Sequence, residues 1–207
     1  MNELLPIVLD IETSGMDKVR CGIWQIGAVD LNNPEEYFLE ESRIDDEDEI
    51  VDSGDKPVLE VIGKTETELR DRKKQSQIQL LENFFGWVEK RPTKNFLCQN
   101  PFFDVGYLDL KARKYEIKMP FHYRSFDLHS FAQGVYHKIN GKFLLEGNHS
   151  GMGLTNILKF CGMTDNRKAH NALEDAKLTG ECFSRLIYGK NIFPEYAGFE
   201  IPERLKI

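Results

Sequence analysis

The sequence predicts an α/β fold, in which a mixed five-stranded sheet is flanked by helices. Two observations predict it. Three apolar runs typical of strands occur within the first 42 residues, and helical and strand patterns alternate after residue 73. Three strands in succession, followed by alternating helices and strands, imply a mixed sheet with helices on its faces. In such a sheet, ligands collect at the carboxyl ends of the parallel strands.

The first three strands are expected near residues 5–11, 22–31 and 36–42, and a variable acidic segment of about residues 43–73 follows them. The later elements are a helix near 75–90, a strand at 95–99, a helix at 101–115, a strand at 122–127, and helices at 128–138, 154–161 and 172–188. A short tail of about residues 189–207 ends the chain. At 207 residues the chain can bury one good core, so we expect a single domain spanning residues 1–207.

Several global features limit the class of protein. The sequence has no run of eighteen or more apolar residues, and the short run at 4–9 lacks the basic start and the small-residue cleavage site of a signal peptide. Cys21, Cys98, Cys161 and Cys182 are widely scattered without a C-x-x-C pair, which argues against a zinc site and for reduced, mostly buried thiols. We therefore expect a soluble, cytoplasmic protein that does not bind a membrane.

The acidic residues are concentrated in one segment. Residues 35–56 contain eleven acids against Arg43 and Lys56, a net charge of −9, whereas the whole chain carries −7 and the remainder therefore +2. The rest of the protein need not repel a phosphate backbone. A calcium loop does not fit residues 45–49, because the D-x-[DN]-x-[DN]-G spacing is absent, and a solvated edge or loop is the favoured interpretation.

Two acids end the first apolar run. Asp10 and Glu12 stand two positions apart after residues 6–9, and in an extended strand such side chains point the same way, roughly 7 Å apart. A strand this apolar is expected to be buried on both faces, where two unpaired charges would cost several kcal/mol each. A bound cation would remove that cost. The alternative is a pair of exposed acids at a fraying strand end.

Two further blocks each place an aspartate in the first turn of a helix. Asn100 followed by proline is typical of an N-cap with proline at the first helical position, which puts Asp104 one turn in. Asn171 with Glu174 three residues later is an asparagine version of the capping box, and it puts Asp175 in the opening turn of its helix. The helix dipole favours negative charge there, so ordinary dipole matching is the alternative explanation for either aspartate.

His170 lies just before the second of these caps. Five residues correspond to about 140° around a helix, so His170 and Asp175 would not converge if both were helical. A histidine in the preceding loop can swing over a site while Asp175 stays fixed, and the alternative is a plain surface histidine. Four carboxylates beside strand ends and helix starts suit a shared divalent-metal site.

Together these blocks resemble the DEDD exonucleases, in the subgroup (DEDDh) that includes the proofreading subunit of DNA polymerase III, ribonuclease T and oligoribonuclease. The first motif is Asp10-x-Glu12, the second is carried by Asp104 within NPFFD, and the third is His170-x4-Asp175. Each motif alone is weakly specific, whereas all three in order and in the expected structural context are strong.

The resemblance extends from about residue 5 to residue 188 and implies a ribonuclease H-like fold. One departure is Gln25, where many members carry glutamate. Gln25 is not one of the catalytic acids, so we expect activity to remain.

The resemblance implies a metal-dependent 3′ to 5′ exonuclease with two Mg²⁺ or Mn²⁺ ions per site. Asp10 would bridge both ions, Glu12 and Asp175 would hold the ion that binds the attacking water, and Asp104 would support the second ion, partly through water. His170 would be the general base, because the ordinary pKa of histidine lies near neutrality. The enzyme would release nucleoside 5′-monophosphates from the 3′ ends of single-stranded DNA or RNA.

Substrate contacts are expected from aromatic, apolar and basic groups close to the motifs. The candidates are Thr13, Met16, Phe102, Phe103, Tyr107, Lys159, Arg167 and Lys168. Aromatic rings stack on any base at roughly 1–3 kcal/mol per base, which suits a sequence-tolerant enzyme. The alternatives are that Phe103 and Tyr107, four residues apart, face the core, and that the basic residues are solvated surface.

Two other functions stay open at this point. One is a non-catalytic nucleic-acid or partner-binding module on the same fold, and the other is a phosphodiesterase for small nucleotides. The motifs are equally compatible with DNA, RNA or very short oligonucleotides, with proofreading or RNA processing, and with any oligomeric state. A polymerase partner is not indicated, because only about twenty residues follow the last expected helix, and we expect a stand-alone enzyme.

Overall fold

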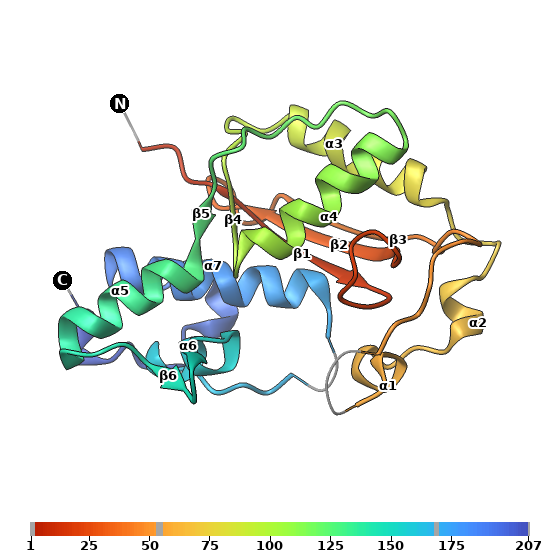
Figure 1. The fold of residues 1–207 in the computed structure, drawn as a ribbon. Coiled ribbons are helices and arrows are strands. Elements are labelled where there is room, and N and C mark those ends of the chain that lie inside the picture. The colour runs from red at the N-terminus through yellow and green to blue at the C-terminus, as the bar shows by residue number, and fades with distance from the viewer. Residues whose placement is uncertain (1–2, 53–55, 168–169, 207) are drawn as a thin grey trace.

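The computed structural model describes residues 3–52, 56–167 and 170–206 (Figure 1). Five strands form one sheet in the order β3-β2-β1-β4-β5. The antiparallel neighbours are β1 (Ile7–Thr13), β2 (Ile23–Asp30) and β3 (Tyr37–Glu41), and the strands that extend the sheet in parallel with β1 are β4 (Phe96–Cys98) and β5 (Phe126–Asp127). The predicted mixed five-stranded sheet is thereby confirmed.

The helices flank this sheet. They are α1 (Val58–Ile62), α2 (Glu66–Leu69), α3 (Gln77–Glu89), α4 (Pro101–Lys114), α5 (Leu128–Asn140), α6 (Leu154–Phe160) and α7 (Ala172–Tyr188). A short hairpin of β6 (Leu145–Glu146) and β7 (His149–Ser150) links α5 to α6. The helices predicted from residue 75 onward are confirmed to within a few residues, whereas α1, α2 and the hairpin are additions.

The sheet separates two hydrophobic cores. Alternate side chains of a strand face opposite sides. Accordingly Ile7, Leu9 and Ile11 join the core beneath α3 and α4, whereas Val8 joins the core shared with α5, α6 and α7. Figure 1 shows α3 and α4 above the sheet and α5, α6 and α7 below it. Asp10 and Glu12 continue the alternation of Val8, so β1 directs both acids toward the α7 side.

The two predicted helix caps differ in their outcome. Asn171 caps α7 as expected, because its side-chain oxygen accepts hydrogen bonds from the N–H groups of Leu173 and Glu174, both at 3.1 Å. Asn100 precedes α4 as expected, but its side chain makes no capping hydrogen bond. Its backbone is left-handed (φ 66°), a conformation that asparagine tolerates. The Asn100 N–H instead donates to Asp127 Oδ1 at 3.2 Å.

The strand predicted at 122–127 is shorter in the structure. Only Phe126 and Asp127 pair with β4, opposite Leu97 and Cys98. β4 itself has three residues, which limits how far its neighbour can extend. Residues 115–125 therefore form a long connection from α4 to β5, which crosses the top of the molecule in Figure 1.

Residues 45–49 form a loop in which Asp46, Glu47 and Glu49 are exposed, as expected, but the segment is fixed against the rest of the protein and Asp48 is not solvated. Asp48 is buried and accepts a hydrogen bond from Lys111 Nζ of α4 at 2.7 Å. The Val51 N–H donates to Ser14 O at 3.0 Å, and the Ser14 hydroxyl donates to Glu49 O at 2.6 Å. The segment is thus bonded to the loop that follows β1, and this attachment places α1 beside the end of that strand.

The chain after α7 returns to the body of the protein. Arg185 of α7 is fully buried, pairs with Glu181 at 2.8 Å, and donates to the carbonyls of Tyr196 and Phe199. These bonds hold the two 3₁₀ turns at Pro194–Tyr196 and Glu203–Leu205 close to α7. Across the described residues, no helix combines the length and the apolar character needed to cross a membrane.

Candidate metal centre and active-site cleft

Two acidic side chains come from the carboxyl end of β1. Asp10 lies opposite Gly27 of β2, and Glu12 lies opposite Gln25. The pairing register shifts between Glu12 and Thr13, and such irregularities in a ladder are common next to active sites because they redirect the strand. Glu12 is buried, and Asp10 is half-buried.

The third acid is contributed by α4. Asp104 lies in the first turn of that helix and is buried. Its Oδ1 accepts a hydrogen bond of 3.2 Å from the N–H of Ile11, which is the residue between the two acids of β1. This bond joins the start of α4 to the end of β1 and holds the Asp104 carboxylate beside the strand.

The fourth acid is positioned by close packing of α7 on β2. Gln25 Oε1 accepts a hydrogen bond of 2.8 Å from the Ala172 N–H, one of the free backbone donors at the start of α7. A Cβ atom on Gly27 would lie 2.1 Å from the Leu173 nitrogen, so only glycine permits the helix to approach this closely. Asp175, one turn into α7, is thereby buried at the end of β1.

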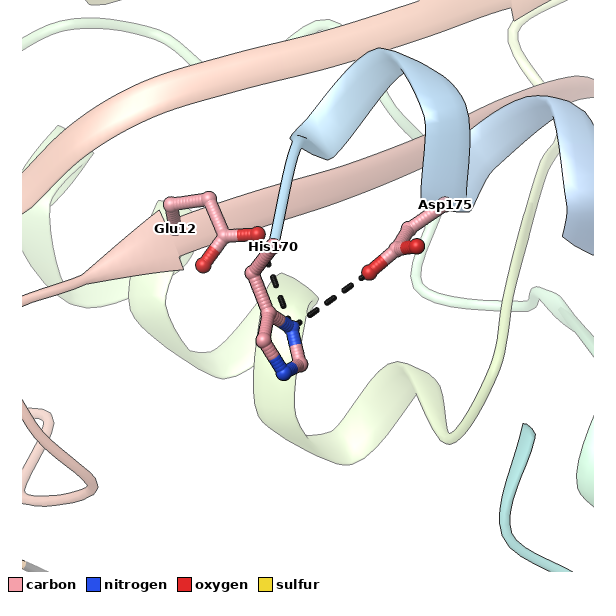
Figure 2. A group of neighbouring side chains, drawn as sticks. All are labelled: Glu12, His170 and Asp175. Carbon is pink, nitrogen blue, oxygen red and sulfur yellow. Dashed lines mark ion pairs between the residues drawn. The ribbon is translucent and has the colours of Figure 1, made fainter. Parts of the chain in front are cut away.

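His170 completes the group from the loop just before α7. Figure 2 shows the imidazole between the Glu12 and Asp175 carboxylates. Its Nδ1 is 3.5 Å from Asp175 Oδ2 and 3.9 Å from Glu12 Oε1. The His170 side chain is 49% exposed, whereas both carboxylates are buried. The position in a loop, predicted from the sequence, leaves the ring partly free in a site of otherwise fixed groups.

Burial dominates the electrostatics of the acids. It raises the pKa of Glu12 to about 8, and nearby His170 opposes this shift. Burial raises the pKa of Asp104 to about 7, and burial together with the carboxylates of Asp104, Glu12 and Asp175 raises the pKa of Asp10 well above its ordinary value. The His170 pKa is raised above 6.5, chiefly by its interaction with Asp175. Without a counter-ion, several of these groups would hold protons near neutral pH.

One arginine already opposes this negative charge. Arg167 Nη1 lies 2.9 Å from Asp175 Oδ1, so the two Asp175 oxygens face different partners, Arg167 and His170. The guanidinium is fixed from behind by Asp165, which accepts from Nε at 2.9 Å and from Nη2 at 2.7 Å. Sequence reasoning treated Arg167 as a substrate contact or solvated surface. Its ion pair with a motif acid depends on the fold of the 165–167 turn and has no sequence signature.

The donor set fits a divalent metal. Glu12 Oε1 is a buried oxygen with no hydrogen-bond partner among the described residues, and such atoms in native proteins call for an explanation such as a bound ion. Ligand atoms of Glu12, His170 and Asp175 lie within 4.8 Å of one another. Oxygen ligands from carboxylates are those that Mg²⁺ and Mn²⁺ prefer. Asp10 and Asp104 line the same cavity and supply further oxygens.

All five motif residues line one cavity of about 560 Å³. Met16, Phe102 and Phe103, which the sequence proposed as substrate contacts, are among the residues that line it. Val58, Val61 and Ile62 of α1 also line the cavity, and they were not among the predicted residues. A signal existed in the sequence, since apolar residues at positions i, i+3 and i+4 between Pro57 and Gly63 are typical of a short amphipathic helix.

The remaining predicted contacts are placed differently. Thr13 lines the cavity, but its hydroxyl donates to Gly15 O at 2.6 Å. Tyr107 is fully buried, and its hydroxyl also donates to Gly15 O at 2.6 Å, so it supports this loop instead of facing a ligand. Lys159 is exposed and lines an adjoining hollow that includes Arg167 and His170. Lys168 lies outside the described residues.

The chain is similar to known proteins at the level of family and of structure. The family model RNase_T, described as "Exonuclease", matches residues 7–183. No curated protein sequence gives a significant match. The nuclease domain of 3'hExo, described as a DEDDh family member bound to rAMP, aligns with a TM-score of 0.65 and 16% identity, covering 95% of this chain and 95% of that chain.

Two further solved structures have the same fold. Cell-death related nuclease 4 aligns with a TM-score of 0.66 and 15% identity over 87% of this chain and 62% of that chain. Escherichia coli exonuclease I in complex with a dA16 oligonucleotide aligns with a TM-score of 0.66 and 18% identity over 87% of this chain. The match covers 40% of the exonuclease I chain, so this protein spans about two-fifths of that length.

Proposed function

This chain belongs to the RNase_T exonuclease family, and we propose that it is a metal-dependent 3′ to 5′ exonuclease. It would hydrolyse phosphodiester bonds at the 3′ end of single-stranded DNA or RNA and release nucleoside 5′-monophosphates. The strongest support is that the motif residues, which come from three separate parts of the chain, line one cavity. They are Asp10, Glu12, Asp104, His170 and Asp175.

Four acids would hold the metal. Asp10, Glu12, Asp104 and Asp175 offer oxygens at the end of β1, and burial makes their ionised forms costly in the absence of a cation. Two Mg²⁺ or Mn²⁺ ions bound there would activate a water molecule and stabilise the departing oxygen of the phosphodiester. Family membership supports dependence on a divalent metal, and one structure of E. coli exonuclease I with single-stranded DNA contains zinc.

His170 would act as the general base. Its partly exposed ring can approach a water molecule in the cleft, while Asp175 Oδ2, 3.5 Å from Nδ1, orients it. The neutral imidazole accepts the proton, and the neighbouring carboxylates stabilise the imidazolium that results. Because Asp175 raises the pKa of His170, the neutral form that accepts a proton becomes abundant at a higher pH than it does for an ordinary histidine.

The apolar walls of the cleft suit a terminal nucleoside. Met16 is 58% exposed and lines the cavity together with Phe103 and the α1 residues Val61 and Ile62. A base placed between such side chains gains from burial and stacking whatever its identity. Neighbouring structures contain bound rAMP, dA16 and dT13, which supports a nucleotide or single-stranded oligonucleotide as the ligand.

The test is hydrolysis of a 5′-labelled single strand in the presence of Mg²⁺ or Mn²⁺, with EDTA as the metal-free control. We expect a ladder of products that shorten one nucleotide at a time from the 3′ end. Asp10→Ala and Asp175→Ala should abolish this ladder, whereas Asp46→Ala, which changes an exposed acid paired with Arg72, should leave it intact. Binding without trimming would instead indicate a non-catalytic module on the same fold.

Parallel reactions with DNA, RNA and a dinucleotide on one preparation would define the substrate. A protein that cleaves model diesters but ignores every oligomer would be a phosphodiesterase for small nucleotides and would contradict the proposal. A preference for DNA, for RNA or for the dinucleotide would identify the substrate class.

A further inference from the structure

A second hollow, of about 480 Å³, lies along α4 next to the catalytic cleft. Phe102 lines both cavities. The other walls come from Val105 of α4 and from Met119, Phe121 and Tyr123 of the connection between α4 and β5. We call this hollow the α4 groove.

Two exposed aromatic rings beside cations line the groove. Phe102 is 80% exposed and Tyr123 is 77% exposed, more than any other aromatic side chain that the structure describes. Lys18 Nζ lies 3.5 Å from the centroid of the Phe102 ring, and the Arg124 guanidinium carbon lies 5.2 Å from that of Tyr123. Stacking surfaces beside positive charges are the combination with which proteins bind single-stranded nucleic acids.

The chemistry of the proposed reaction gives the strand a direction. In an in-line displacement, the attacking water and the departing oxygen lie on opposite sides of the phosphorus. His170, Glu12 and Asp175 gather beside α7, whereas Asp104 arrives from α4 on the other face of the sheet. With the water near His170, the departing oxygen faces α4. That oxygen is the 3′ oxygen of the preceding nucleotide, so the rest of the strand leaves the cleft on the α4 side.

We infer that the α4 groove binds the nucleotides on the 5′ side of the scissile bond, with Phe102 at its entrance and Tyr123 as a stacking platform inside it. This inference rests on the proposed exonuclease function and extends it. The substrate would be a single strand of several nucleotides, because a dinucleotide has only one nucleotide on the 5′ side of the scissile bond and would occupy no more than the entrance of the groove.

The test compares two substrates on three variants. Tyr123→Ala removes the platform, and Tyr123→Phe keeps the ring without the hydroxyl. Phe143→Ala is the matched control, because Phe143 is 56% exposed and lines neither cavity. Its ring packs at a tilt against His137, as that of Tyr123 does against His122. Each variant is assayed with a single-stranded octamer and with a dinucleotide in Mn²⁺.

We expect Tyr123→Ala to raise the KM for the octamer by about 5- to 150-fold, which is the equivalent of 1–3 kcal/mol of stacking. The KM for the dinucleotide should change far less. Tyr123→Phe should restore the octamer value, and Phe143→Ala should match the wild type with both substrates. An unchanged octamer KM, or an equal change for both substrates, would overturn the inference.

Binding in EDTA separates this inference from the proposed function. Fluorescence anisotropy of a 5′-labelled octamer measures Kd when no hydrolysis occurs, and Tyr123→Ala should weaken it by the same factor. If the wild type trims no substrate but the Kd effect is present, the exonuclease proposal fails and the groove stands. If trimming occurs and the Kd is unaffected by Tyr123→Ala, the groove fails and the exonuclease proposal stands.

Discussion

Among the five motif residues, His170 has the most exposed side chain. Since its proposed role is to accept one proton, we expect His170→Ala to lower kcat by about 10²- to 10⁴-fold, the usual contribution of a general base. Metal binding should persist, because the four acids remain. Steady-state rates with the labelled single strand provide the measurement, and His149→Ala, an exposed histidine in β7, provides the control. A His170→Ala enzyme with the wild-type rate would contradict the assignment.

At the scale of residues, the positions of side chains could be predicted where their spacing along a strand or helix determines which residues lie next to them. Asp10 and Glu12 share a face because strand geometry requires it, and Asp175 follows a cap that the structure confirms. Arg167 was not placed, because its pairing with Asp175 depends on a turn with no spacing rule. Tyr107 was misplaced because an aromatic residue one turn after Asp104 can face either the core or the cleft, and it faces the core.

At the scale of elements, the approach of α7 to β2 controls the position of Asp175. A Cβ atom on Gly27 would lie 2.2 Å from the Ala172 carbonyl carbon. We therefore expect Gly27→Ala to displace the start of α7 and to reduce Mn²⁺ affinity, measured by titration calorimetry, at least about tenfold. Gly134→Ala in α5 is the control, because a Cβ atom there meets no atom within 4 Å. It should instead stabilise the protein by about 0.5–1 kcal/mol.

Removing one partner of the ion pair between the acidic segment and α4 should cost far more stability than breaking an exposed pair of that segment. Lys111 and Asp48 are both buried and 2.7 Å apart. Lys111→Ala leaves a buried carboxylate without this partner, so we expect urea denaturation to show a loss of roughly 3–5 kcal/mol. Arg72→Ala breaks only the exposed pair with Asp46 and should cost less than about 1 kcal/mol.

A double variant separates the charge from the packing. Asp48→Asn combined with Lys111→Met leaves no buried charge and keeps similar volume. It should recover most of the stability that Lys111→Ala loses. A double variant as unstable as Lys111→Ala would indicate that packing around the Lys111 stem, and not the unpaired carboxylate, explains the loss.

Prediction of elements from the sequence succeeded where the hydrophobic pattern was long. β1 and β2 are continuous apolar runs, and α3 and α7 are long enough to show a period of 3.6 residues. α4 was located by the asparagine and proline at its start. α1 has apolar residues at positions i, i+3 and i+4, but it has only five residues and α2 has four, so neither was assigned as a helix. Asp48 was expected to be solvated like its neighbours, because the nearby sequence contains few basic residues that could pair with it. Its partner, Lys111, lies 63 residues later in α4.

At the scale of the whole molecule, the buried acids should make the metal-free protein less stable as the pH rises from 4.5 to about 8. The folded Glu12 has a pKa of about 8, against 4.5 for the ordinary group. Between these values the folded state holds a proton that the unfolded chain has lost, so the free energy of unfolding falls as pH rises. Glu12→Gln removes this titration. In EDTA, its stability relative to the wild type should therefore increase from pH 5 to pH 8.

Metal should reverse this dependence. Ligands must lose their protons to bind a cation, so Mn²⁺ should stabilise the wild type more at pH 8 than at pH 5. Urea denaturation with Mn²⁺ or EDTA at both pH values measures the effect. A stability difference between wild type and Glu12→Gln that is independent of pH in EDTA would contradict the prediction.

The location of α1 has a consequence for how such an enzyme can diversify. The acids of the proposed metal site are carried by β1, α4 and α7, whereas Val58, Val61 and Ile62 line the cleft from a segment that is bonded to Ser14 and Lys111. Val58 and Ile62 are buried in a cluster that includes Trp24. Val61 is 38% exposed, so its substitution could reshape the space for the terminal base with the least disturbance of the core. Substrate choice could thus evolve independently of catalytic power, through a part of the chain that no motif covers.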